Sequence, residues 1–321
     1  MKTLLITIDT EADWKDQSTN SIKNIYELHW LQQLMNKYNY IPTYLLSYEI
    51  ANNKNCVEVI KPYFDEGKCD IGHHLHIWST PPFENENEYG VDNDWLLGIQ
   101  TEIKDEIFES KMNHLHSLIK KQFNYEPIVH RAGRWAIDKR TLIWLKKHNY
   151  IVDTSICANI SWHGTKGVLD SIKLNSESVS NKAYLPSKNN ILKNTRIQNE
   201  QIGVLEIPVS SFGGDLLDLV KIRGKNTIRR FLYLLGYKGM TKSSLRPQIN
   251  ISNSVYESNV NSLFTNNDNV YNFMFHSSEL IIKQSNKVKE QIEIVLQLAS
   301  KNNLIGKKVS EFGKDYFKKL N

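Results

Sequence analysis

Short apolar runs typical of buried strands alternate with helical patterns along most of this chain, and this alternation constrains the fold more than any other feature. Apolar and β-branched runs predict seven strands, at Thr3–Asp9, Ile41–Ser47, Cys69–His73, Pro127–Arg131, Ile151–Thr154, Val204–Val209 and Val270–His276. Apolar residues at three- and four-residue spacing predict helices, at Ile22–Tyr38, Val57–Glu66, Glu102–Phe123, Asp138–His148, Thr227–Leu235 and Lys287–Ala299. Repeated βα units of this kind predict an α/β fold around a parallel sheet.

The domain organisation follows from the same pattern. Since no change of composition marks a linker, we expect residues 1–321 to form a single closed or nearly closed barrel. Two long irregular segments interrupt the pattern, at about 79–98 and about 161–201. Loops of such length in compact domains are often functional, and the second is expected to form extra hairpins or a cap.

The composition is that of a globular protein. With 321 residues, 40% of them hydrophobic, the chain can bury a large core. The apolar run Leu4–Ile8 is short and is soon followed by charged residues, which predicts neither a signal peptide nor a membrane span. The three cysteines, Cys56, Cys69 and Cys157, fit neither a disulfide scaffold nor a thiolate zinc site. We therefore expect a cytoplasmic protein.

The charge distribution carries a weaker signal. A net charge of +5 without an arginine-rich arm predicts no nucleic-acid partner. Lysine and arginine alternate with leucine, phenylalanine and tyrosine between about 216 and 246. Such a stretch is most often a solvated helix face, and it also fits a peripheral contact with anionic lipid at the inner face of the membrane. The sequence does not predict the oligomeric state.

Polar clusters follow several of the predicted strands, and in a βα barrel the carboxyl ends of the strands converge on one mouth. Asp9 and Glu11 come at the end of the first strand. Two carboxylates there can divide the work, because one can bind a metal ion while the other acts as general base on a water at that ion. Taken alone, the pair is also typical of a solvated strand end.

Three imidazoles follow the third strand within four positions, at His73, His74 and His76. Imidazole suits zinc and other late divalent ions, and three histidines so close together are hard to satisfy as ordinary core residues. In extended backbone His74 and His76 project to one side and His73 to the other. The cluster therefore predicts a site for a divalent metal ion, with zinc as the expected ion.

Other strand ends supply a guanidinium, a carboxylate and an imidazole. Arg131 ends the fourth strand, and a permanent cation beside a carboxylate lowers the pKa of that carboxylate. Asp153 lies in the fifth strand and His276 ends the seventh. Histidine is suited to protonating a leaving amine, and an acidic neighbour such as Asp153 would orient its ring. These three residues join Asp9 as candidate catalytic residues.

In their order along the chain, the clusters resemble the five motifs of the NodB-homology polysaccharide deacetylases, carbohydrate esterase family four. The matching stretches are Thr7–Glu11, Gly72–Trp78, His130–Trp135, Asp153–Ser155 and Met274–Leu280. The resemblance implies a distorted seven-stranded (β/α) barrel, with Asp9 as base and Glu11 as metal ligand. The second motif of the family usually has two histidines four residues apart, whereas Trp78 stands at that position here. His76 is the nearest substitute for the second histidine ligand, and His73 is the alternative.

The stretch from His74 to Phe83 is similar to a bacterial branch of the family that is associated with surface polysaccharide and lipopolysaccharide gene clusters. The resemblance implies a metal-dependent hydrolase that removes the N-acetyl group of an amino sugar. The substrate would be a surface polysaccharide, a lipopolysaccharide, or its lipid-linked or nucleotide-linked precursor.

The implied mechanism assigns a role to each candidate residue. The metal ligands would be Glu11, His74 and His76. Asp9, oriented by Arg131, would take a proton from the attacking water, and His276, supported by Asp153, would protonate the departing amine. Two alternatives stay open. One is a deacylase of another group, N-formyl or O-acetyl, and the other is a catalytically silent glycan-binding barrel, which Trp78 at a ligand position favours.

Overall fold

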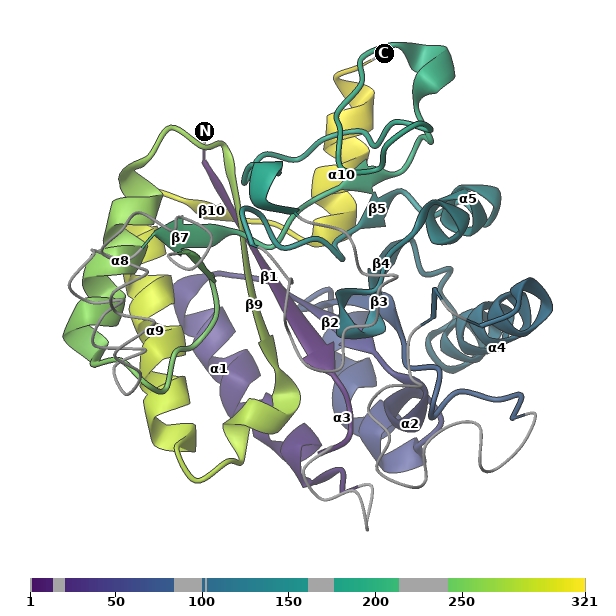
Figure 1. The fold of residues 1–321 in the computed structure, drawn as a ribbon. Coiled ribbons are helices and arrows are strands. Elements are labelled where there is room, and N and C mark those ends of the chain that lie inside the picture. Colours follow the sequence, from purple (N-terminus) through teal and green to yellow (C-terminus); the bar gives the residue numbers. More distant parts are fainter. Residues whose placement is uncertain are drawn as a thin grey trace, which may run out of the picture.

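The seven predicted strands form one parallel sheet in the computed structural model, which describes residues 2–13, 21–83, 100–101, 103–160, 176–213 and 242–320. The strands are β1 (Thr3–Thr10), β2 (Pro42–Leu46), β3 (Asp70–Leu75), β4 (Val129–Ala132), β5 (Val152–Asp153), β6 (Leu205–Glu206) and β9 (Val270–His276). They run in the order β9-β1-β2-β3-β4-β5-β6, and every pairing is parallel. The sheet curls into a half-barrel, which confirms the expected distorted (β/α) barrel (Figure 1).

The segment after β6 bridges the remaining gap toward β9. The Ser210 amide donates to the Asn272 carbonyl over 3.0 Å, and the Asn272 amide donates to Ser210 Oγ over 2.9 Å. The Asn272 side chain also donates to the Ile207 carbonyl. The first and last strands of the barrel are therefore joined through side chains and single backbone bonds, not through a full ladder.

Helices cover the outer face of the sheet. In the view of Figure 1, α1 (Leu28–Tyr38), α8 (Asn253–Thr265) and α9 (Ser285–Lys301) lie at the left, and α4 (Asp105–Phe123) and α5 (Lys139–Lys147) lie at the right. Five predicted helices are present, as η1 (Lys23–Glu27) leading into α1 (Leu28–Tyr38), and as α3 (Lys54–Asp65), α4 (Asp105–Phe123), α5 (Lys139–Lys147) and α9 (Ser285–Lys301). The predicted helix at Thr227–Leu235 lies outside the described residues. Within the described residues, three α-helices were not predicted, namely α2 (Tyr48–Ala51), α8 (Asn253–Thr265) and α10 (Val309–Lys318).

Period-two alternation in β1 separates the two faces of the sheet. Leu4, Ile6 and Ile8 belong to the large core beneath the helices. Leu5 lies in a second apolar cluster inside the barrel, made of one or two residues from most strands and closed by α10. Because side chains two apart share a face, Asp9 follows Leu5 along the barrel interior toward the carboxyl ends of the strands. The active-site end is therefore polar while the opposite end is apolar.

The two expected insertions are only partly described. Of the segment at about 79–98, residues 84–98 lie outside the described residues, as do residues 161–175 of the second segment. The described part of the second segment forms antiparallel bridges between Tyr184 and Glu206, Pro186 and Asn194, and Ser187 and Gln201. Of the basic stretch at about 216–246, only 242–246 are described, where β8 (Lys242–Ser244) pairs with β7 (Ser211–Gly213). Within the described ranges, every helix is too short or too polar to cross a bilayer.

Candidate active site

Strand register brings the predicted site residues together. Asp9 at the end of β1 lies opposite His276 of β9, and His74 of β3 lies opposite Arg131 of β4. Glu11 follows β1 by one residue and is 6% exposed. All of these side chains except that of His276 are buried. Parallel strands end at the same edge, so residues from four distant parts of the sequence meet at one mouth.

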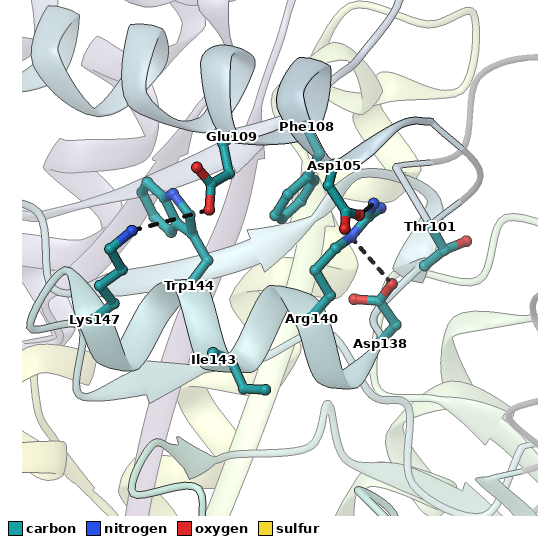
Figure 2. Close-up of a pocket in the computed structure, with 9 residues that line it drawn as sticks. All are labelled: Thr101, Asp105, Phe108, Glu109, Asp138, Arg140, Ile143, Trp144 and Lys147. Carbon is teal, nitrogen blue, oxygen red and sulfur yellow. Dashed lines mark hydrogen bonds and ion pairs between the residues drawn. The ribbon is translucent and has the colours of Figure 1, made fainter.

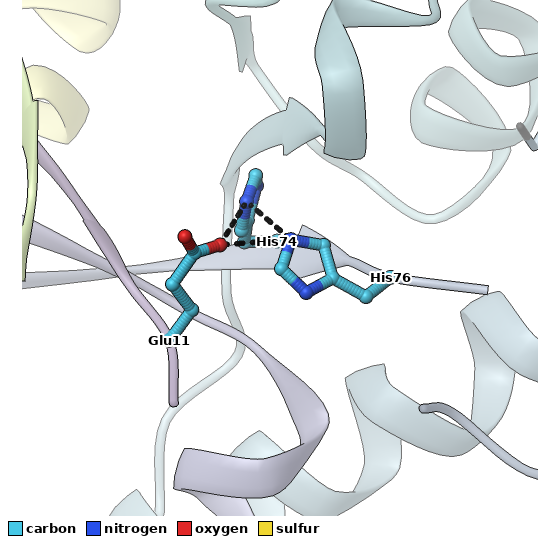
Figure 3. A group of neighbouring side chains, drawn as sticks. All are labelled: Glu11, His74 and His76. Atoms are coloured by element: carbon cyan, nitrogen blue, oxygen red, sulfur yellow. Dashed lines mark hydrogen bonds and ion pairs between the residues drawn. The ribbon is translucent and has the colours of Figure 1, made fainter. Parts of the chain in front are cut away.

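Glu11, His74 and His76 form a compact group of possible metal ligands (Figure 3). Glu11 Oε2 lies 3.0 Å from His76 Nε2 and 3.7 Å from His74 Nε2, and the two imidazole nitrogens are 3.0 Å apart. Ligand atoms of a tetrahedral zinc site with bonds of about 2.1 Å lie about 3.4 Å from one another. The observed spacings bracket this value, and the set of one carboxylate and two imidazoles suits zinc.

Hydrogen bonding prepares His74 to act as a ligand. Its Nδ1 lies 3.0 Å from the Arg131 carbonyl oxygen, which can only accept a hydrogen bond. In the neutral ring the proton therefore lies on Nδ1, and the lone pair of Nε2 points toward Glu11 and His76. This tautomer is the one that a metal ion at Nε2 requires.

Electrostatics favour a cation between Glu11 and His76. Burial alone would raise the pKa of Glu11, but the nearby imidazoles of His276, His74 and His76 lower it well below its usual value. Burial alone would lower the pKa of His76, but the hydrogen bond and charge of Glu11, together with the nearby carboxylate of Glu49, raise it to about 10. A proton on His76 supplies this positive charge, and a divalent ion that binds to both side chains can replace the proton.

Asp9 is held ionised beside this group. Its Oδ1 accepts a 2.6 Å hydrogen bond from Arg131 Nη1, and its Oδ2 lies 3.9 Å from His74 Nε2 and 3.7 Å from His276 Nε2. Burial would raise the pKa of Asp9, but the charge of Arg131, followed by those of His74 and His276, lowers it below its usual value. An ionised carboxylate beside the candidate metal ligands can accept a proton from a water molecule at that place.

The Arg131 side chain is fully buried and has a partner at each side of its guanidinium. Besides Asp9, it donates to the Thr154 carbonyl over 2.8 Å and to Thr7 Oγ1 over 2.7 Å. A lysine has no planar fork with which to make these bonds together. Arg131 thus fixes both the charge and the orientation of the Asp9 carboxylate.

Replacing Arg131 with methionine is expected to lower the free energy of unfolding by about 3–5 kcal/mol at pH 7, because Asp9 would be left buried without its cation. In the wild type the pKa of Asp9 is lowered, so this stabilisation is present above the unfolded pKa of about 3.9 and is lost as the pH falls through the folded value. In the variant, burial is left to raise that pKa, and protonation relieves the cost. Urea unfolding should show that the difference in unfolding free energy between the wild type and the variant is smaller at pH 4 than at pH 7. The same difference at both pH values would contradict the role of Arg131 as the cation that holds Asp9 ionised.

His276 has a different neighbour from the one expected. Its Nδ1 lies 3.4 Å from Arg246 Nη2 and 4.0 Å from Glu279 Oε2, and Glu279 is ion-paired with Arg246. Asp153 instead accepts a 2.6 Å hydrogen bond from His130 and two from Ser155. No contact between Asp153 and His276 occurs among the described residues. The expected support of His276 by Asp153 is therefore corrected to Glu279, because Asp153 is already engaged in a separate buried network.

His73 faces away from the candidate metal ligands Glu11, His74 and His76. Its ring is fully buried against His130, Trp144 and Tyr150, with centroid distances of 5.4, 6.2 and 6.0 Å. Burial, and then the nearby histidine His130, lower the pKa of His73 well below its usual value. Of the two alternatives for a second histidine ligand, only His76 lies beside Glu11 and His74.

Several residues that support the site carried no local sequence signal. The Asn24 side chain donates to the Glu11 carbonyl over 2.7 Å and to Ser277 Oγ over 2.8 Å, which ties the loop after β1 to the end of β9. Gly133 allows close packing, since a Cβ there would lie 2.9 Å from His76 Cδ2. The pairing of His276 with Glu279 could have been found, because the His-x-x-Glu spacing fits the capping box that is present here.

Two surface hollows in the described part of the chain lie apart from this group. One, of about 500 Å³, lies between α4 and α5, and Figure 2 shows Arg140 between Asp105 and Asp138 in it, with Trp144 at its other end. The other, of about 640 Å³, lies between the 178–201 segment and the end of α10. None of the predicted site residues lines either hollow. The candidate active site is therefore defined by its chemistry, and neither of these two hollows marks it.

Comparison with known proteins bears on the fold. No family model matches the sequence, and no curated protein matches it significantly. A protein from Mycobacterium smegmatis described as a polysaccharide deacetylase has a TM-score of 0.57 at 12% identity, over 100% of this chain and 92% of its own. A protein from Parabacteroides distasonis described as a glycoside hydrolase/deacetylase has a TM-score of 0.63 at 10% identity, over 99% of this chain and 71% of its own.

A third similar structure, the 4-alpha-glucanotransferase of Thermococcus litoralis, has a TM-score of 0.53 at 9% identity, over 98% of this chain and 38% of its own. Because proteins described with different activities share this architecture, the similarity of fold alone does not establish the reaction. At these identities it shows the fold alone. The chain has the distorted (β/α) barrel fold that is found in proteins described as polysaccharide deacetylases.

Proposed function

We propose that this protein is a metal-dependent deacetylase that hydrolyses the N-acetyl group of an amino sugar. One observation carries the proposal. Glu11, His74 and His76 meet within 4.8 Å at the same barrel mouth as a buried, ionised Asp9. A set of ligands beside a general base is the arrangement that metal-assisted hydrolysis of an amide needs. Two structures of similar fold are described as deacetylases, which supports the choice of reaction.

The residues present fit a divalent metal ion, and zinc is the proposed one. Glu11, His74 and His76 would hold it through Oε2, Nε2 and Nε2, the three atoms that already converge. When bound, the ion would supply Lewis acidity toward the amide carbonyl and would lower the pKa of a water molecule. Glycoside hydrolysis by paired carboxylates would leave His74 and His76 without a role, whereas metal-assisted hydrolysis uses both as ligands.

The side chains around this site divide the proton transfers between them. Arg131 binds Oδ1 of Asp9, so Oδ2 is the oxygen that faces the reaction space and accepts a proton from the attacking water. His276 Nε2 lies 3.7 Å from the same oxygen and is positioned to give a proton to the departing amine. Water addition and C–N cleavage then yield acetate and a free amino sugar. Glu279 and Arg246, and not Asp153, flank the far nitrogen of His276.

Metal removal tests the proposal. Full-length protein should bind one equivalent of zinc and release acetate from N-acetylated amino sugars, and a chelator should abolish the release until zinc is restored. Acetate, formate and metal content are measured on a panel that includes N-formyl and O-acetyl sugars, which separates the three acyl groups. Undiminished acetate release by metal-free protein would refute the mechanism. Zinc-loaded protein that binds these sugars without hydrolysing any of them would be a glycan-binding barrel instead.

We further propose that the substrate is a cytoplasmic precursor of a surface polysaccharide or lipopolysaccharide. The support is the similarity of the stretch from His74 to Phe83 to the branch associated with surface polysaccharide and lipopolysaccharide gene clusters, together with the basic composition between about 216 and 246. Basic residues interleaved with aromatic ones favour contact with anionic lipid. Co-sedimentation of the protein with vesicles should therefore increase with their content of anionic lipid and should fall with added salt. Binding that ignores lipid charge would contradict a membrane-linked substrate.

A further inference from the structure

A half-buried carboxylate that the proposed mechanism does not use lies behind His76, the second proposed histidine ligand. Glu49 belongs to α2, the short helix after β2, and its Oε1 lies 3.7 Å from His76 Nδ1. Its side chain is 17% exposed. Both His76 Nδ1 and the second oxygen, Oε2, are buried without a hydrogen-bond partner among the described residues. The Glu49 carboxylate is therefore placed to accept a hydrogen bond from His76 Nδ1.

The ring of His76 is also held across its plane. Trp78 stacks on it with a centroid distance of 4.2 Å and an interplanar angle of 21°. The Arg134 guanidinium lies over Trp78, 4.6 Å from the ring centroid. Gly133 removes the Cβ that would press on His76 Cδ2. Stacking fixes the plane of the imidazole but leaves open which nitrogen carries its proton.

The outer nitrogens of His74 and His76 face different acceptor groups. His74 donates from Nδ1 to the Arg131 carbonyl. No backbone carbonyl of the described residues accepts a hydrogen bond from His76 Nδ1, and Glu49 is the acceptor group that faces this nitrogen. A histidine that binds a metal ion usually donates its other N–H to a carboxylate or carbonyl, which orients the ring and makes the ligand nitrogen more basic.

We propose that Glu49 is a positioning residue of the metal centre, which holds the proton of His76 on Nδ1 and so presents Nε2 to the ion. The inference rests on the metal site of the proposed function and deepens it. It explains how a chain with Trp78 at the expected position of the second histidine retains two imidazole ligands. Trp78 fixes the plane of His76, and Glu49 selects its ligand atom.

Zinc affinity of the full-length protein tests this role without any assay of activity. Metal-free wild type and variants are titrated with zinc in competition with a chromophoric chelator. Glu49→Leu removes the acceptor at similar size and is expected to weaken zinc binding about 10–100-fold, the usual effect of losing such a partner. Glu49→Gln keeps an acceptor oxygen and loses the charge, so a smaller loss is expected. The absorption spectrum of the cobalt(II) form should change in Glu49→Leu, because the geometry at His76 is altered.

Glu58→Leu is the matched control, since Glu58 lies on the neighbouring α3, is 61% exposed and contacts Lys54 across the helix surface. It should bind zinc like the wild type. Thermal unfolding of each metal-free variant shows whether the fold is intact, and Glu49→Gln carries the test if Glu49→Leu does not fold. Unchanged zinc affinity in the Glu49 variants overturns the positioning role. A wild type that binds no stoichiometric zinc overturns that role and the metal site together, whereas a zinc-loaded wild type that releases no acetate overturns the proposed reaction alone.

Discussion

Asp9→Asn is expected to lower kcat for acetate release by about 10²- to 10⁴-fold, the contribution of a positioned general base. Asparagine keeps the shape of the side chain, and its amide oxygen can still accept the hydrogen bond that Arg131 Nη1 donates over 2.6 Å. It cannot accept a proton from water at the oxygen that faces His276. The change therefore removes the proton acceptor and leaves the packing of the side chain unchanged. Steady-state kinetics on the best substrate of the panel, with zinc content determined in parallel, measures the effect.

Asp65→Asn serves as the control, because Asp65 is 54% exposed on α3, contacts Lys61 at 2.9 Å and is not one of the candidate site residues. Its kcat should equal that of the wild type. Zinc content should be unchanged in both variants, since Asp9 lies outside the group of three ligand atoms. Wild-type kcat in Asp9→Asn would remove this residue from the role of base. Loss of zinc together with activity would make Asp9 a ligand.

The barrel was predictable because its strands are buried on both faces. Such strands tend to be continuous apolar runs, and those of β1 and β9 stand out between polar segments. The helices α8 and α10 were missed for physical reasons. The α8 sequence is rich in asparagine and serine, which have low helix propensity, and its packing against the core overrides that preference. Gly313 interrupts the pattern of α10, and the structure needs it there because a Cβ would press on Val152 and Ile151.

The grouping of the site followed from the rule that strand ends converge, but the pairing of side chains did not. Asp153 and Glu279 are both carboxylates near strand ends, and sequence alone does not say which of them His276 meets. Asp153 is instead the partner of His130, across the β4–β5 pairing. Arg246 ends the basic stretch at about 216–246, whose pattern did not predict that it meets His276, 30 residues along the chain. Tertiary contacts of this kind are not encoded in a short window of residues.

His74→Ala is expected to weaken zinc binding by more than the about 100-fold that loss of an outer hydrogen-bond partner reaches, because it removes one of three atoms that hold the ion. Acetate release should fall with the metal content. His73→Ala is the sharpest control, since it deletes the same side chain one position away on the opposite face of β3. His73 is fully buried, so its removal should cost about 0.5–3 kcal/mol of stability while zinc stays bound. Zinc content, acetate release and urea unfolding of both variants test the two faces separately. Retention of zinc by His74→Ala and its loss from His73→Ala would reverse the assignment of the faces and would remove His76, on the same side as His74, from the site.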